Sequence, residues 1–166
     1  MARTPSHVMG YWRGVFVAAV AKLDGQAVSR IGEGLLRLEP TSTTGVGLLV
    51  VVAPRAPTPS SEVRNQLAAA VRAVASLKGV AVVYEEKGLH ASIVRSVVAG
   101  IAFISRQNVP NRFFSTLTEA TAWLDPLVHG APSDPAPLVR AVDLIRCDPQ
   151  QLPAGVYVPY RDIDRK

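Results

Sequence analysis

Residues 45–106 constrain the fold more than any other part of the chain. They predict a buried strand over 46–52, an amphipathic helix, a second buried strand over 80–84 and a further helix. A strand without polar residues is typical of a sheet covered on both faces, and such sheets are mostly parallel. Parallel neighbours need a long crossover, which is usually a helix. This stretch therefore predicts an α/β domain.

The N-terminal part extends the pattern by one strand and one helix. Residues 11–21 are apolar at almost every position and predict a central strand, or a hairpin that turns at Arg13 and Gly14. Apolar residues then recur at helical spacing over 28–38, with charged residues between them. Residues 14–21 have some likeness to a short signal peptide, but a core strand is the favoured interpretation.

The second part of the domain is predicted to end on a strand and a helix. Residues 111–115 predict a short last strand, and Thr116 with Glu119 fits a capping box at the start of a fourth helix. We therefore expect a mixed, mostly parallel central sheet of four to five strands with four packing helices, within a domain over residues 1–128.

Helix boundaries within this domain follow from capping residues. The second helix is expected over 59–77, with Thr58 as its N-cap, Pro59 as its first residue and Gly79 as the glycine that closes it. Gly100 stands inside the third helical pattern, where glycine is unfavourable, and so predicts a close contact or a helix end.

Proline becomes frequent near the C-terminus. We interpret residues 129–166 as a Pro-rich extension, with a short amphipathic helix over 138–145. Residues 156–158 are apolar and predict an edge strand or a docking segment.

The charge pattern argues against nucleic acid as a partner. The chain has a net charge of +5, but its arginines are scattered, whereas a nucleic-acid interface needs basic residues clustered on one face. Cys147 is the single cysteine, which suits a reducing compartment. No apolar run has the length of a transmembrane helix. We therefore expect a cytoplasmic protein with no membrane span.

Glu85, Glu86 and His90 are the candidates for chemistry. They follow the carboxyl end of a predicted strand, where open α/β sheets bind ligands, and they are able to do acid–base work or hold a metal. A hydrolase or transferase would need them to converge with another polar group. Adjacent carboxylates tend to point apart, so a solvated turn is favoured, and we expect no catalytic residue, no metal and no cofactor.

The order of elements over residues 11–128 resembles the STAS (sulfate transporter and anti-sigma-factor antagonist) domain family, especially its sporulation-antagonist-like branch. The likeness is carried by LLVVV at 48–52 and VAVVY at 80–84, each before a helix, and by RFF at 112–114 followed by EATAWL at 119–124. The resemblance implies a compact bacterial regulatory module that binds other proteins.

The resemblance also implies a phosphorylation site. Antagonist members carry Asp-Ser-Ser-Gly where a strand meets the second helix, and a partner kinase phosphorylates a serine there. The matching place here is Pro59-Ser60-Ser61-Glu62, which keeps both serines and replaces the aspartate and the glycine. Ser61, Ser60 and Thr58 are thus the candidates. Judged from the residues alone, a capping threonine and two exposed first-turn serines are the favoured interpretation.

We interpret the chain as a non-enzymatic regulatory or scaffolding module that acts through protein–protein contact. Its expected surface surrounds the second helix and includes Glu62, Arg64 and Asn65. Tyr11 and Trp12 would add interface anchors if they are exposed. The expected partner is a regulator, a kinase or a scaffold, and a homodimer stays open.

The alternative is a small-ligand binding domain for a nucleotide or a lipid. Its site would lie at the carboxyl ends of the strands, near residues 53–58 and 85–90. An apolar cavity under the second and third helices would favour this alternative.

Overall fold

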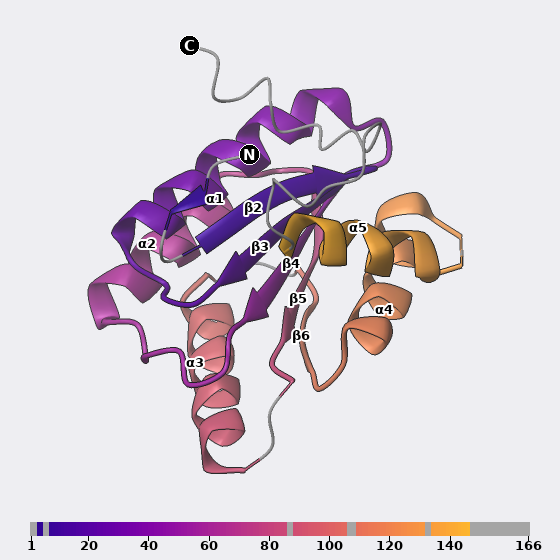
Figure 1. Ribbon diagram of the computed structural model, residues 1–166. Coiled ribbons are helices and arrows are strands. Elements are labelled where there is room, and N and C mark those ends of the chain that lie inside the picture. The colour runs from indigo at the N-terminus through magenta and orange to yellow at the C-terminus, as the bar shows by residue number, and fades with distance from the viewer. Residues whose placement is uncertain (1–2, 5–6, 86–87, 106–108, 132–133, 147–166) are drawn as a thin grey trace.

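The computed structural model describes residues 3–4, 7–85, 88–105, 109–131 and 134–146. The strands form one sheet in chain order, from β1 to β6 (Figure 1). They are β1 (Arg3–Thr4), β2 (His7–Trp12), β3 (Val15–Val20), β4 (Val46–Val52), β5 (Leu77–Val83) and β6 (Asn111–Phe114). β2 is antiparallel to both β1 and β3, whereas β3 to β6 are parallel to one another. The predicted α/β class with a mixed, mostly parallel sheet is confirmed.

The sheet has six strands, more than the sequence led us to expect, because the N-terminus forms a hairpin. Arg13 and Gly14 form its turn, with φ angles of 44° and 83°. Two successive residues with positive φ match the turn whose twist suits a tight hairpin. The hairpin alternative for residues 11–21 is therefore confirmed, and the single strand is wrong. The two-residue β1 supplies the further strand.

Three helices cover one face of the sheet and two cover the other (Figure 1). They are α1 (Gly25–Leu38), α2 (Ser61–Arg72) and α3 (Leu89–Ser105) on the first face, and α4 (Leu117–His129) and α5 (Ala136–Arg146) on the second. The crossovers from β3 to β6 all advance one strand in the same direction. Connections of a single handedness then place all three crossover helices on the same face.

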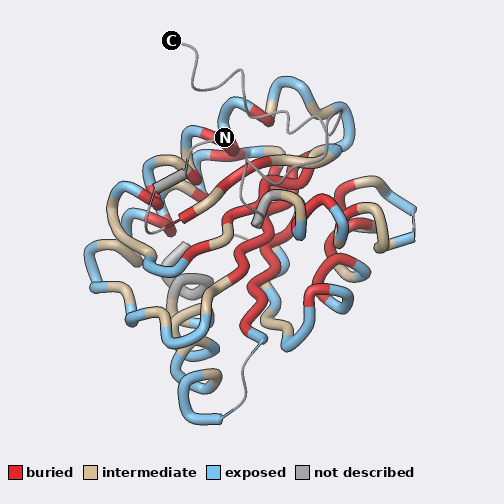
Figure 2. Tube along the Cα trace, viewed as in Figure 1, coloured by how far each residue is buried: buried red, intermediate tan, exposed pale blue. Residues whose placement is uncertain are grey.

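The two faces have separate apolar cores, and the central strands are buried along their length (Figure 2). Phe16 and Val20 of β3 face the core under α1, α2 and α3, whereas Val15 and Val17 face the core under α4 and α5. This alternation is the period of two that a strand imposes on its side chains. It explains why β3 is apolar at every residue.

The start of α2 differs from the prediction by two residues. Ser60 is the N-cap, with an extended backbone, and its Oγ accepts a hydrogen bond from the Val63 N–H at 3.3 Å. The prediction of Thr58 as N-cap and Pro59 as first residue is wrong. Thr58 and Pro59 belong to the loop that lines the cavity, and Ser60 provides the capping oxygen in place of Thr58.

Two glycines also have other roles than predicted. Gly79 is buried in β5, where a Cβ would lie 3.0 Å from Leu127 Cδ1, so it permits close packing of α4 and does not close α2. The predicted helix over 59–77 thus ends at Arg72. Gly100 is a helix-interior residue, and no described atom outside its own stretch of helix backbone lies within 4 Å of the position of a Cβ, so it marks neither a helix end nor a close contact with another described segment.

The C-terminal predictions agree with the structure as far as Arg146. Thr116 caps α4 and accepts a hydrogen bond from the Glu119 N–H at 3.2 Å, so the capping box is confirmed. The short helix expected in the extension is present as α5, which contributes Leu138 and Val142 to the second core. Residues 156–158 lie outside the described residues. In the described part, no helix combines the length and apolarity needed to cross a bilayer.

Candidate functional site

A partly open apolar cavity of about 90 Å³ lies between the sheet and the helices α2 and α3. The floor consists of residues of β4 and β5 that point to the first face, and the walls come from both helices. These strands place short valines where larger side chains would fill the space. Floor and wall residues include Leu48, Val50, Val80, Val82, Leu67, Val71, Val94, Val97 and Val98.

The loop between β4 and α2 forms part of the rim. Ala56, Pro57, Thr58 and Pro59 line the cavity from this side. Arg55, with a φ of 57°, turns the loop, and its N–H donates a hydrogen bond to the Tyr84 Oη at 3.3 Å. The Tyr84 side chain is only 1% exposed. This hydrogen bond and the prolines of the loop restrict its conformations, which limits the entropy lost on binding.

Asn111, the first residue of β6, is the other polar residue that lines the cavity besides Thr58. Its Oδ1 is buried and has no hydrogen-bond partner among the described residues. A buried carbonyl oxygen without a partner costs about 1–3 kcal/mol. Asn111 is therefore a polar residue with an unsatisfied oxygen in an otherwise largely apolar lining.

A shallow, open groove between α2 and α3 adjoins the cavity. Arg64, Ser92 and Ser96 line it together with Ile93 and Val97, and these last two also line the cavity. The Arg64 guanidinium donates a hydrogen bond to Ser61 Oγ at 3.0 Å, and its Nε is buried without a described partner. The groove thus offers a positive charge beside an apolar cavity.

Two large apolar side chains are exposed at the same end of α3. Leu89 is 78% exposed and Ile93 is 38% exposed, and they are one helical turn apart. Residues four apart on a helix lie on the same side, so these two form a short apolar stripe. Ile93 also forms part of the cavity wall. The stripe and the cavity are therefore one apolar surface.

The structure brings some predicted residues to this surface and leaves others away from it. Thr58 lines the cavity and Arg64 lines the groove, whereas Glu62 and Asn65 are exposed on α2. Ser60 and Ser61 are exposed at the start of α2. Tyr11 and Trp12 lie on β2, far across the sheet from α3, and pack half-buried against the first and second core respectively.

Glu85 and His90 do not form a buried reactive site. Both are exposed, and Glu86 lies outside the described residues. Catalytic carboxylates and imidazoles are usually tuned by burial and by charged neighbours. In the part of the chain that the structure describes, no group of three or more His, Cys, Asp or Glu residues has an arrangement suited to a metal ion.

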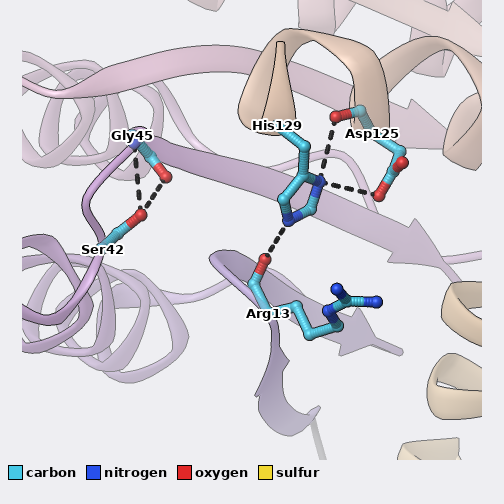
Figure 3. Close-up of polar contacts among 5 residues, drawn as sticks. All are labelled: Arg13, Ser42, Gly45, Asp125 and His129. Atoms are coloured by element: carbon cyan, nitrogen blue, oxygen red, sulfur yellow. Dashed lines mark hydrogen bonds and ion pairs between the residues drawn. The ribbon is translucent and has the colours of Figure 1, made fainter. Parts of the chain in front are cut away.

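A polar cluster that the sequence did not reveal joins α4 to the hairpin turn (Figure 3). His129 Nδ1 lies 3.1 Å from the backbone oxygen of Asp125 and 3.0 Å from its Oδ1, and Nε2 lies 2.8 Å from the backbone oxygen of Arg13. Ser, His and Asp are the side chains of a hydrolase triad. Here, however, the Ser42 hydroxyl bonds to both the backbone N–H and oxygen of Gly45. No contact between Ser42 and His129 is present among the described residues, so the His129 contacts connect the end of α4 to the hairpin turn and the Ser42 contacts close a separate turn.

Two groups with shifted pKa values lie outside the cavity. Burial lowers the pKa of His7, with Asp24 opposing this effect and Arg30 adding to it. The backbone N–H of Ser76 donates to Glu39 Oε1 at 2.7 Å and lowers the pKa of that carboxyl. The hydrogen bond between Ser76 and Glu39 connects the segment after α1 to the segment before β5.

Neither a family model, nor a curated protein, nor a solved structure matches this chain. The functional conclusion therefore depends on the residues and the geometry of the surface described above.

Proposed function

We propose that the chain is a non-enzymatic regulatory or scaffolding module that acts through protein–protein contact at the mouth of the cavity. The observation that carries this proposal is the exposure of Leu89 and Ile93 beside a preformed apolar cavity. Apolar side chains next to a concave pocket are typical of interfaces, where a partner inserts an anchor residue and water is excluded. The resemblance to STAS domains supports the same function.

A phosphorylation switch at the start of α2 belongs to this proposal. Ser61 is exposed and its Oγ already accepts a hydrogen bond from Arg64. A phosphate on Ser61 would pair with Arg64 and with the N-terminal dipole of α2, against repulsion from Glu62. Modification of Ser60 would instead replace the hydroxyl that caps the helix. Either change adds negative charge at the start of α2, directly after Pro59 of the cavity lining.

The test is partner capture from a lysate of the native host, with Leu89→Asp as the variant. Leu36→Asp is the matched control, because Leu36 is also a large exposed side chain, at 47%, but lies on α1. We expect a partner that binds the wild type and the control and is lost from Leu89→Asp. A partner retained equally by all three proteins would contradict the proposed surface. Ser61→Asp tests the switch in the same assay.

Small-ligand binding is the second candidate, and the cavity itself favours it. A cavity of about 90 Å³ with apolar walls does not suit a nucleotide, which carries a base, a sugar and charged phosphates. It suits part of a lipid-like molecule. For either candidate we propose a cytoplasmic location, in keeping with the single cysteine.

A further inference from the structure

The cavity and the groove beside Arg64 adjoin each other, because Ile93 and Val97 line both. We propose that this site binds an unbranched aliphatic monocarboxylate, with the end of its chain in the cavity and its carboxylate beside Arg64. The inference deepens the small-ligand candidate and rests on it. It does not depend on a protein partner.

The volume of the cavity limits how much of the chain it takes up. An apolar protein cavity of about 150 Å³ accommodates one benzene molecule, so about 90 Å³ accommodates about four carbon atoms. The described lining residues are apolar except for Thr58 and Asn111, which makes burial of methylene groups favourable. Each methylene that leaves water strengthens binding about fourfold. The rest of the chain extends through the open mouth.

Arg64 supplies the charge that a carboxylate needs. Its guanidinium uses one N–H group for Ser61 Oγ, and its Nε is buried without a described partner. A guanidinium has five N–H donors in a planar fork that matches a carboxylate. The nearest acidic residue on α2, Glu62, accepts a hydrogen bond from Gln66 Nε2 at 3.4 Å. Arg64 is thus placed to hold an anionic head group at the mouth of an apolar cavity.

The experiment is a calorimetric titration of the full chain with butanoate, hexanoate, octanoate and decanoate, and with 1-hexanol and 1-octanol as neutral probes. We expect the affinity for carboxylates to rise about fourfold per methylene and then to level off once the cavity holds about four carbons. The alcohols should bind more weakly than carboxylates of equal length, because they lack the charge that pairs with Arg64.

Two variants with matched controls locate the ligand. Val94→Phe places a ring in the cavity and should abolish binding, whereas Ala99→Phe, at an exposed position of α3, should leave it unchanged. Arg64→Gln should weaken carboxylate binding about ten- to hundredfold and leave alcohol binding unaltered. Arg72→Gln, at an exposed position of the last turn of α2, is its control.

Each contrary result has a definite meaning. Equal affinity for alcohols and carboxylates, with no effect of Arg64→Gln, would overturn the carboxylate and leave the small-ligand candidate standing. Unchanged binding to a folded Val94→Phe protein would overturn the site. Failure of every probe to bind the wild type would overturn this inference together with the small-ligand candidate. If Val94→Phe does not fold, the comparison of Arg64→Gln with Arg72→Gln decides on its own.

Discussion

Gly34 provides a sharp test of how α1 packs on the sheet. A methyl group at this position would overlap the Cε2 and Cζ atoms of Phe16 and would lie 3.0 Å from its Cδ2. Phe16 is fully buried in the first core, so its ring can move only by displacing the side chains around it. Gly34→Ala should therefore destabilise the protein, although alanine is the better helix former.

The magnitude follows from two opposing effects. Replacing a helix-interior glycine by alanine stabilises a protein by about 1 kcal/mol. Overpacking a well-filled core costs about 1–3 kcal/mol, and overlap with a buried aromatic ring belongs at the upper end. The net loss is then about 2 kcal/mol, which lowers the Tm of a domain of this size by about 4–8 °C.

The control is Gly100→Ala in α3, where no described atom outside its own stretch of helix backbone lies within 4 Å of the new Cβ. This variant should raise the free energy of unfolding by up to about 1 kcal/mol, because only helix propensity changes. Urea denaturation, followed by tryptophan fluorescence, measures both variants. Stabilisation of the protein by Gly34→Ala, equal to that by Gly100→Ala, would refute the packing of Phe16 beneath α1.

Three further predictions concern polar contacts that connect separate elements. Burial lowers the pKa of His7, so the folded protein favours the neutral imidazole. The stability that this neutral side chain contributes is complete above pH ~6.5 and is lost as the pH falls below that value. In the His7→Gln protein, the urea midpoint should therefore decline less between pH 7.5 and 5 than in the wild type. Because the pKa of Glu39 is lowered, the stability contributed by its carboxylate is present above pH ~4.3 and is lost in acid. A Glu39→Gln protein should therefore lose less stability than the wild type as the pH falls below that value. His129→Phe should lower the free energy of unfolding by about 0.5–1.5 kcal/mol, because Arg13 and Asp125 lose a hydrogen-bonding partner. An unchanged Tm would contradict this role.

Much of the fold could be predicted because its signals are local. The apolar residues of β4 predict a strand covered on both faces, and the structure shows that strand between two apolar cores. The capping box of Thr116 and Glu119 is a contact between residues three apart, and it starts α4 as expected. Where several residues satisfy the same local rule, the prediction was less accurate: Thr58 and Ser60 are both good caps, and Ser60 starts α2.

The candidate site could be predicted only in part. The sequence indicated that ligands would bind near the carboxyl ends of the strands and that Arg64 belonged to the exposed surface of α2. It did not reveal that Ile93 would join a groove and a cavity, that Asn111 would line the cavity with an unpaired oxygen, or that Leu89 would be exposed beside it. Apolar residues at helical spacing predict a buried face equally well whether or not the space beneath them is filled.

The sequence by itself determined the class of the fold, the order of its elements and the two faces of the central strands. These properties follow from hydrophobic periodicity and from capping and turn residues, all of which act over a few neighbouring positions. Only the tertiary structure decided where a cavity remains between α2, α3 and the sheet, and that His129 reaches Arg13, 116 positions away. Such features depend on how the volumes and polar groups of distant segments fit together, and no local pattern encodes that fit.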